Sequence, residues 1–502
     1  MPVTVQAILT IGDPRLETPV PPADLTDPAL TGRLADLHAT LDDFRARRGF
    51  GRAIAAPQIG FMCRCIALNL GAGPVSILNP EITWRSVDEF LVWDDCLSIP
   101  DRIVHVRRAC SIELRYQDEN GRIRLWRRLP EDLSELLQHE IDHLDGILMT
   151  ARASGEDAVR PISEHAELIG TARPRHRLRL DAIERASRSI DPVFLHTPQF
   201  ESDTLNRALG CRIMAKVETV NPVRNFKGRG ADFFLSERST SLQTSAASRA
   251  SAAGQTLVTA SAGNWGQALA YAAASRGVPL IVFAAVSANP LKLIRMRELG
   301  SDVRLAGDDF DAAKHAAKSF AESSGAWMVE DGREPEIAEG AGTIARELLS
   351  TGAALDAVFI PLGNGSLLTG MARWLKAASP CTRIIGVCAA GADAMKISHE
   401  QGRLIDRPRV DTIADGIGVR VPVPEALADM RGLVDEIDLV SDDELLDSVR
   451  LAFEHFRLII EPSAAAGLAA IAQRRAELAG QHVATVFCGA NVTTEQARAW
   501  LG

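Results

Sequence analysis

The pattern of apolar and polar positions divides the chain into two parts. In the first part, apolar residues recur at helical spacing over residues 29–48, and a second helix over 130–145 begins with Pro130 and an acidic first turn. Short stretches between these helices have the composition of strands. The predicted strands cover residues 75–83, 102–106 and 110–117, and a hairpin turn is predicted at 117–122.

Residues 152–180 have a different character, because they are rich in Arg, His and Pro and show little apolar periodicity. We expect this segment to be a linker between a domain at 1–151 and a domain at 181–502. In the second domain, apolar runs alternate with Ala-rich helical stretches, which predicts an α/β domain with a mainly parallel sheet. The apolar runs cover 256–260, 279–286, 356–361 and 383–388, whereas the polar stretch 236–254 is predicted to be a helix end and a loop.

Composition and charge exclude several classes of protein. Apolar residues make up 46% of the chain and charged residues 24%, which is typical of a core-forming protein. The net charge of −10 disfavours binding to nucleic acid. No apolar run reaches the ~18 residues that a membrane span requires, and the N-terminus does not resemble a secretory signal. The eight cysteines are sparse and fit a cytoplasmic protein, in which Cys63 and Cys65 are predicted to be buried strand thiols.

The basic residues are distributed unevenly, because 48 arginines stand against seven lysines. The first 215 residues contain no lysine. Chemistry that needs an amine nucleophile is therefore confined to the second part of the chain.

His139 and His143 lie four residues apart in the second predicted helix, so both rings can reach one metal ion. Glu140 lies between them and is placed to deprotonate a water molecule on that ion. The same short pattern also arises by chance on a charged, solvated helix face. The pattern alone leaves both interpretations open.

Two further segments accompany this helix. GRAIAAPQIG (51–60), DDCLSIP (94–100) and QHEIDHLDGIL (138–148) follow one another in the order and spacing of the three peptide deformylase motifs, and the first 150 residues resemble that family, which has an α+β fold. The resemblance implies one Fe²⁺ or Zn²⁺ ion with three protein ligands and an open fourth position. It also implies a general acid/base and two donors to the oxyanion that forms at a formyl carbon. The implied ligands are Cys96, His139 and His143, the acid/base is Glu140, and the donors are Gln58 and the backbone N–H of Leu97.

The sequence departs from the deformylase motifs at two places. Ala53 replaces a glycine, and Asp94-Asp95 replaces Glu-Gly before the cysteine. We expect these positions to line the substrate channel, so that the charge near the substrate is altered. An N-formyl peptide, a smaller or differently charged formamide, and a retained fold without turnover are all compatible with these changes.

Lys227 is the lysine whose surroundings suggest catalysis. It follows Phe226 in NPVRNFKGRGA, and Gly228 and Gly230 allow other backbone to approach closely. A lysine beside an aromatic ring can be desolvated and become nucleophilic. The other six lysines lie in helical or strand-like contexts in which a solvated side chain is the usual role.

The Lys227 segment resembles the lysine motif of the serine/threonine dehydratases, which are pyridoxal-phosphate enzymes of fold type II with parallel sheets, flanking helices and two subdomains. The resemblance covers about residues 180–502. Its motifs follow in family order as LHTPQ (195–199), SAGNWGQALAYAAA (261–274), PLGNGSLLTG (361–370), TIADGIGV (412–419), EPSAAAG (461–467) and FCGANV (487–492).

The resemblance implies that Lys227 binds pyridoxal 5′-phosphate covalently and later removes the α-proton. A thiol at Cys488 would leave the pyridine nitrogen unprotonated, which favours β-elimination over transamination. The phosphate loop would hold the anion with backbone N–H groups. The implied cofactor residues are Phe226, Lys227, Asn264, Gly363, Asn364, Gly365, Ser366, Leu367 and Cys488, and the implied substrate residues are Ser261, Ala262, Gly263 and Trp265.

This segment also departs from its family. Trp265 stands where dehydratases usually have histidine, so the substrate preference is open. Ala262 occupies the position of the serine base of family racemases, which argues against racemisation. Cys388 replaces a glutamate that holds a divalent cation in some relatives, so we expect no such site. Ser261, Asn264 and Glu461 can also be explained by ordinary turn and cap hydrogen bonds.

These expectations combine into a two-module, bifunctional enzyme. A pyridoxal-phosphate ammonia-lyase would convert a β-substituted hydroxy amino acid into a 2-oxo acid and ammonia, and a metal-dependent deformylase would act on an N-formyl amino acid or peptide. An N-formyl group blocks the amine that the lyase needs, so the deformylase module could unmask the lyase substrate. A non-catalytic assembly module and a β-replacement synthase are the alternatives, and Gly228 disfavours the synthase because its relatives have Asp there. A homodimer is implied by the dehydratase resemblance.

Overall fold

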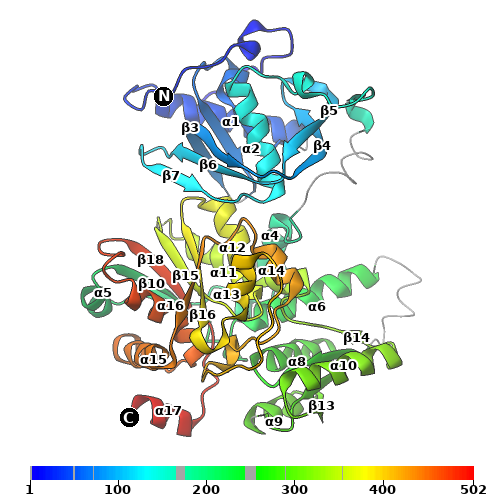
Figure 1. Ribbon diagram of the computed structural model, residues 1–502, viewed down its shortest axis with the longest axis vertical. Coiled ribbons are helices and arrows are strands. Elements are labelled where there is room, and N and C mark those ends of the chain that lie inside the picture. Colours follow the sequence, from blue (N-terminus) through cyan, green and yellow to red (C-terminus); the bar gives the residue numbers. More distant parts are fainter. Residues whose placement is uncertain are drawn as a thin grey trace. The chain divides into compact units, whose positions relative to one another are not determined.

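The computed structural model describes residues 3–48, 51–71, 73–164, 176–243, 256–288, 290–352 and 354–502. The chain forms two compact units, and for most of its length the division falls between Arg177 and Leu178 (Figure 1). Within the described part of the chain, no helix is both long and apolar enough to span a bilayer. The eight cysteines are free thiols.

The first unit contains two antiparallel sheets and two main helices. Its larger sheet has the strand order β1-β2-β3-β6-β7 and its smaller sheet the order β4-β5-β8. The strands are β1 (Ala53–Ala55), β2 (Cys65–Asn69), β3 (Pro74–Arg85), β4 (Glu89–Cys96), β5 (Ile99–Ala109), β6 (Ile112–Gln117), β7 (Ile123–Trp126) and β8 (Val159–Pro161). Helix α1 (Leu30–Arg48) and helix α2 (Glu131–Leu144) lie at the two predicted helical positions.

The strand prediction is confirmed for β3, β6 and the hairpin that joins β6 to β7. β5 is longer than the segment 102–106, and β4 was not predicted. Cys65 begins β2, whereas Cys63 lies just before that strand, and both thiols are buried.

Helix α2 contacts β1 of the larger sheet and β5 of the smaller sheet. All its residues after Glu131 are buried. Leu133, Leu137 and Ile141 join the apolar core of the larger sheet. Because polar residues alternate with these leucines, the helix carries a polar face into the interior, and that face holds both histidines.

The first unit extends beyond the predicted boundary at residue 151. Strand β8, which lies within the predicted linker 152–180, pairs with β5 through Arg102–Pro161, Ile103–Arg160 and Val104–Val159. The polar sequence hid this strand because it adds an exposed edge to a sheet, where no continuous apolar run is required. Residues 165–175 of the predicted linker lie outside the described residues.

The second unit contains two sheets flanked by helices. The larger has the order β17-β16-β15-β18-β10-β9 and is parallel except for β9, and the smaller has the parallel order β13-β12-β11-β14. The strands are β9 (Gln199–Glu201), β10 (Arg212–Val217), β11 (Leu257–Ala260), β12 (Leu280–Ala284), β13 (Asp302–Leu305), β14 (Trp327–Met328), β15 (Ala357–Pro361), β16 (Arg383–Ala389), β17 (Glu436–Val440) and β18 (His482–Phe487).

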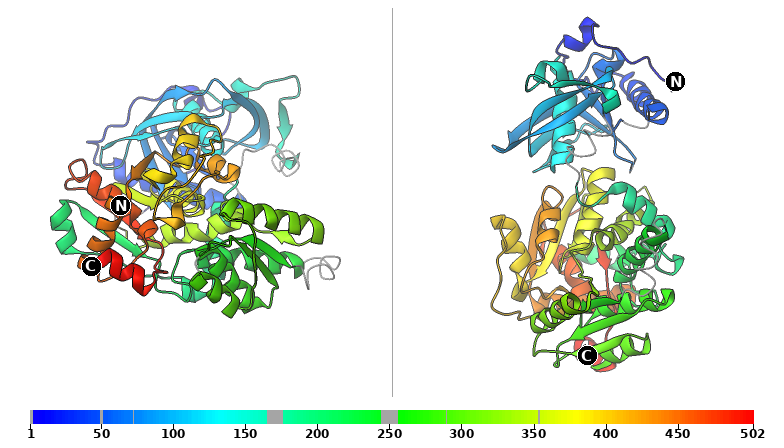
Figure 2. Two further views of the ribbon diagram at one scale, coloured as in Figure 1. Left: turned by 60° about the horizontal axis from the view of Figure 1, so that its bottom comes forward. Right: turned by 90° about the vertical axis from the view of Figure 1, so that its right-hand side faces the viewer.

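The helices of this unit can be followed in Figures 1 and 2. They are α4 (Leu180–Ser189), α5 (Asp203–Leu209), α6 (Lys227–Gln243), α8 (Asn264–Arg276), α9 (Pro290–Glu298), α10 (Phe310–Ser324), α11 (Pro335–Leu349), α12 (Ser366–Ala378), α13 (Ala394–Gln401), α14 (Pro424–Met430), α15 (Asp442–Phe456), α16 (Pro462–Gln473) and α17 (Thr494–Leu501). The predicted helix end at 236–254 is described only as far as residue 243, and residues 244–255 lie outside the described residues.

Alternate side chains of β11 and β12 enter two different cores. Val258 and Phe283 pack with alanines of α10, whereas Leu257 and Val282 pack with alanines of α8. Both faces of the smaller sheet are therefore covered by helices. This explains why the strands appear in the sequence as continuous apolar runs rather than as alternating ones.

A buried ionic network fixes the beginning of α6. Arg229, which is 1% exposed, donates to both carboxylate oxygens of Glu218 at 2.8 Å and to those of Glu347 at 2.6 and 2.9 Å. Lys216 donates to Glu347 at 2.6 Å. Because Arg229 lies two residues after Lys227, this network fixes the backbone that carries the candidate catalytic lysine.

We expect Arg229→Met to lower the free energy of unfolding by about 3–5 kcal/mol, because it leaves buried carboxylates without their guanidinium partner. Urea denaturation measures the change. Arg409→Met is the matched control, since Arg409 and Asp411 form an exposed pair with side chains 80% and 77% accessible; its effect should stay below about 0.5 kcal/mol. An equal effect of both substitutions would contradict the role given to the network.

Candidate functional sites

The structure brings Cys96, His139 and His143 together. Cys96 ends β4, and the two histidines project from the same face of α2. Cys96 Sγ lies 3.2 Å from His143 Nε2, and one ligand atom from each of the three residues lies within 4.8 Å of the others. All three side chains are buried. One thiol and two imidazoles at this spacing form a donor set suited to Fe²⁺ or Zn²⁺.

Asp94 orients His139. Its Oδ2 lies 3.1 Å from His139 Nδ1 and accepts a hydrogen bond of 2.7 Å from Arg108. Arg108 also donates to Asp142 at 2.5 Å. Burial alone would raise the pKa of Asp94, but Arg108 and His139 lower it to about 2. Because Asp94 contacts His139 Nδ1, the other ring nitrogen, Nε2, is free to bind a metal ion.

The expectation that Asp94 lines the substrate channel was wrong. Its side chain is 2% exposed and faces Arg108 and His139 in the interior. Asp95 is partly exposed, because successive side chains of a strand point to opposite faces. Asp95 is thus the more accessible carboxylate of the pair.

Gln58 and Glu140 flank the three candidate ligands. Gln58 Nε2 lies 3.7 Å from Cys96 Sγ and donates to Ser98 Oγ at 3.1 Å, so the amide donors face the cluster. Burial raises the pKa of Glu140 to about 7. Leu97 directly follows Cys96 and is buried. The six residues assigned to this site therefore gather at one place in the fold.

Two buried atoms of the residues assigned to this site have no hydrogen-bond partner among the described residues. They are Glu140 Oε2 and His143 Nδ1. A buried polar atom without a partner costs free energy unless it serves a ligand or a reaction. The orphan carboxylate oxygen belongs to Glu140, which is next to His139 in α2 and interacts electrostatically with it, and this fits a resident metal ion and a bound substrate.

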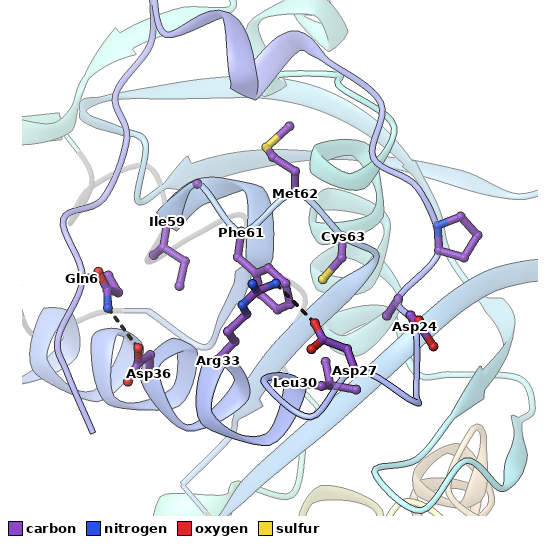
Figure 3. Close-up of a pocket in the computed structure, with 13 residues that line it drawn as sticks. Gln6, Asp24, Asp27, Leu30, Arg33, Asp36, Ile59, Phe61, Met62 and Cys63 are labelled. Carbon is purple, nitrogen blue, oxygen red and sulfur yellow. Dashed lines mark hydrogen bonds and ion pairs between the residues drawn. The ribbon is translucent and has the colours of Figure 1, made fainter. Parts of the chain in front are cut away.

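A separate pocket lies near η2 (Ala56–Ile59) in the same unit (Figure 3). Arg33 lies 4.8 Å over the ring of Phe61 and 3.5 Å from Asp27, and Gln6 donates to Asp36 at 2.9 Å. None of the three candidate metal ligands lines this pocket. Because these charges already have partners, we assign it no chemistry.

In the second unit, Lys227 begins α6, and its amine has a carboxylate and an aromatic ring as neighbours. Lys227 Nζ is 2.5 Å from Asp331 Oδ2 and 4.7 Å from the centre of the Phe226 ring. Gly228 is required here, because a Cβ atom at this position would lie 2.3 Å from the ring of Phe194. The predicted close approach at the glycine after the lysine is thus present.

The loop before α12 has the geometry of an anion cradle. Gly365 has a φ of +103°, and a Cβ atom there would lie 2.7 Å from Ala426. A Cβ atom on Gly363 would lie 2.8 Å from the carbonyl oxygen of Gly416. Because the first N–H groups of a helix have no partner within it, this loop and the start of α12 present donors to a phosphate.

The candidate cofactor residues other than Asn264 line one cavity. It is formed by Phe226, Lys227, Pro361, Gly363, Asn364, Gly365, Ser366, Leu367, Gly416, Ile417 and Cys488. The lysine, the cradle and the buried thiol fit a phosphate-bearing aldehyde cofactor. Burial raises the pKa of Cys488 to about 12, so its thiol is neutral near pH 7.

Asn264 belongs to a polar network beside this cavity. Its Nδ2 donates to Glu461 at 2.8 Å, and its Oδ1 accepts from Asn491 Nδ2 at 2.7 Å. Glu461 also accepts from the backbone N–H of Asn491 at 2.6 Å, and burial raises its pKa. Sequence reasoning missed Asn491, although it follows directly after the FCGA part of a recognised motif.

The four predicted substrate residues, Ser261 to Gly263 and Trp265, line a second cavity that also includes Lys227 and Asp331. Ser261 Oγ accepts from the N–H groups of Gly263 and Gly266 at 3.2 and 2.9 Å, so it links the turn before α8 to the first turn of that helix. Trp265 Nε1 donates to Thr259 at 2.9 Å, so its polar atom faces the core.

Asp331, Lys292 and Asp415 also line this second cavity and were missed from the sequence. They lie in three different segments. Asp415 belongs to the recognised motif TIADGIGV (412–419), whereas Lys292 and Asp331 belong to no recognised motif. Lys292 Nζ lies 2.5 Å from Asp415. Burial lowers the pKa of Lys292, but Asp415 and Glu461 outweigh it and the net shift is upward.

Comparison with known proteins assigns both units. The family model described as polypeptide deformylase matches residues 5–159, and the model described as pyridoxal-phosphate dependent enzyme matches residues 190–489. The L-threonine ammonia-lyase of Geobacter sulfurreducens is 35% identical over 311 residues, which are 62% of this chain and 75% of that protein.

Solved structures agree with this assignment. Maize serine racemase shares 26% identity with a TM-score of 0.58, and the match covers 64% of this chain and 96% of that one. The processed form of threonine deaminase isoform 2 from Solanum lycopersicum shares 28% identity with a TM-score of 0.57, over 64% and 88% of the two chains. The chain therefore belongs to the family of pyridoxal-phosphate dependent enzymes, and its N-terminal unit is a polypeptide deformylase domain.

Proposed function

We propose that the second unit is an ammonia-lyase that converts a β-hydroxy amino acid, threonine or serine, into a 2-oxo acid and ammonia. The observation that carries this proposal is the position of Lys227 in the walls of both cavities, with the phosphate cradle in one and the loop 261–265 in the other. The names of the relatives, L-threonine ammonia-lyase and threonine deaminase, support the same reaction class.

The residues around the two cavities account for β-elimination as the proposed reaction. Bound pyridoxal phosphate supplies an electron sink for the α-carbon. Lys227 holds the cofactor, and its amine then takes the α-proton of the amino acid. Cys488 is neutral and does not protonate the ring nitrogen, which favours loss of the β-hydroxyl. Ala262 offers no group that could return a proton on the opposite face, so elimination is favoured over racemisation.

We expect L-threonine and L-serine to yield 2-oxo acid and ammonia in equal amounts, since one amine leaves for each oxo acid formed. A reductase-coupled assay of 2-oxo acid and an ammonia assay measure this. Adding sulfide provides the discriminating control, because a β-replacement synthase would instead form a thiol amino acid. Accumulation of that product without ammonia would exclude the lyase.

For the first unit, we propose metal-dependent hydrolysis of an N-formyl group. The site would hold Fe²⁺ or Zn²⁺ with Cys96, His139 and His143 as ligands. The bound ion would polarise the formyl oxygen of the substrate. Glu140 is buried, has no partner at Oε2 among the described residues and has a pKa of about 7, which suits proton transfer near neutral pH. Gln58 directs amide donors at the same place and would stabilise the oxyanion.

The two activities would act in sequence on one small molecule. The lyase requires a free primary amine, and hydrolysis of an N-formyl amino acid releases formate and that amine. We further propose that this happens in the cytoplasm, where the free thiols persist, and that the lyase units form a homodimer.

N-formyl-threonine and N-formyl-serine should therefore yield formate first and 2-oxo acid after a lag. Time courses of both products, measured by formate dehydrogenase coupling and by reductase coupling, test the order. N-acetyl-threonine is the matched control, because its acetyl group carries a methyl group in place of the formyl hydrogen. If no formamide releases formate and the purified protein holds no metal, the first unit is an assembly module instead.

A further inference from the structure

Asp331 makes contacts that no expected role explains. Its Oδ2 lies 2.5 Å from Lys227 Nζ, and its Oδ1 accepts a hydrogen bond of 2.6 Å from Ser366 Oγ. The carboxylate therefore joins the candidate catalytic lysine to the first residue of α12. The Asp331 side chain is 6% exposed, so both contacts lie away from bulk water.

The backbone holds Asp331 against the phosphate cradle. Gly332 has a φ of +90°, and a Cβ atom on it would lie 2.4 Å from the carbonyl oxygen of Asn364. The loop between β14 and α11 can therefore approach the cradle only because a glycine follows Asp331. The carboxylate position is thus built into the packing of two loops.

Asp331 and a phosphate group require the same donors. The Ser366 hydroxyl and the N-terminus of α12 belong to the cradle. The partial positive charge of one helix N-terminus stabilises one bound anion. Two anions that share a buried site repel each other strongly because the local dielectric constant is low. Lys227, when it is paired with Asp331 as an ammonium ion, also lacks the free electron pair that it needs to react with an aldehyde.

We propose that Asp331 is a built-in counter-anion that controls how tightly pyridoxal phosphate is held. Loading of the cofactor requires Asp331 to release both Ser366 and Lys227. Before the cofactor binds, the Asp331 carboxylate accepts the hydrogen bond of Ser366 and pairs with the Lys227 amine. Because the cofactor must replace both contacts, Asp331 weakens cofactor binding. Asp331 is a positioning residue, because it acts through the lysine and the serine.

Asp331→Asn tests the proposal, since asparagine keeps the size and one acceptor but removes the charge. Isothermal titration of the cofactor-free protein with three probes separates the two contacts. Pyridoxine 5′-phosphate lacks the aldehyde and reports on Ser366, pyridoxal lacks the phosphate and reports on Lys227, and pyridoxal 5′-phosphate reports on both. We expect the Kd for pyridoxine 5′-phosphate to fall about tenfold, the Kd for pyridoxal to fall by a smaller factor, and the Kd for the complete cofactor to fall most.

Glu330→Gln is the matched control. Glu330 is the neighbouring carboxylate in the same cavity, but it pairs with Lys314 and Lys318. Its removal should change each Kd by less than about twofold. Asp331→Ser is a second neutral variant for the case in which asparagine disturbs folding. Unchanged or weaker binding of pyridoxine 5′-phosphate in the folded neutral variants would overturn the proposal, as would an equal gain in Glu330→Gln.

Discussion

Lys227→Ala should lower the rate of 2-oxo acid formation by about a thousandfold or more, and the protein should no longer hold pyridoxal phosphate covalently. Alanine removes the amine that attaches the cofactor and takes the α-proton, and none of the other described lysines lines both cavities. Borohydride reduction followed by mass spectrometry measures attachment, and the reductase-coupled assay measures turnover.

Lys318→Ala provides the comparison for this result. Lys318 is 45% exposed and lies outside both cavities, so its loss should leave attachment and turnover within about twofold. If cofactor remained attached in Lys227→Ala after reduction, another amine would be the attachment site. The assignment of the reaction to these two cavities would then fail.

Cys96→Ala should reduce the metal content from about one ion per chain to near zero and abolish formate release from N-formyl-threonine. Two imidazoles remain, but the thiolate supplies the charge that most strongly retains Fe²⁺ or Zn²⁺. The same variant should convert free threonine at the normal rate, because the lyase substrate then carries its amine already. Plasma mass spectrometry of the metal, a formate assay and the 2-oxo acid assay provide the three measurements.

Cys110→Ala is the control for loss of a thiol. Cys110 lies in the same unit, outside the candidate metal site, and is only partly buried. It should retain the metal and formate release. A normal metal content in Cys96→Ala, or formate release that survives complete removal of the metal, would contradict the proposed deformylase site.

Local sequence patterns predicted correctly those features that depend only on the geometry of one helix or one short segment. The i and i+4 spacing of His139 and His143 predicted one helix face, and the structure places both rings there. The glycines after Lys227 predicted close backbone approach, and Gly228 indeed packs against Phe194. The alternation of apolar runs with Ala-rich helical stretches predicted a mainly parallel sheet, and the parallel pairs β11–β12 and β15–β16 confirm this.

Other features depend on contacts between distant segments and could not be inferred. Asp94 occupies a position that the sequence assigned to the channel, but its partner Arg108 lies on the next strand and turns it inward. Asp331 meets Lys227 across 104 residues of chain and belongs to no recognised motif. The end of the first unit was misplaced because β8 is an edge strand, whose pairing with β5 is not encoded by apolar periodicity.

The burial of α2 has a consequence for altering the substrate of the first unit by directed evolution. Every residue of this helix after Glu131 is enclosed by protein, so a library that randomises it would mostly yield unfolded chains. Variation at Asp95 and at other partly exposed positions of β4 would be tolerated far better. For the proposed deformylase activity, a change of formamide specificity is therefore more accessible through the strand that ends in Cys96 than through the helix that carries the histidines.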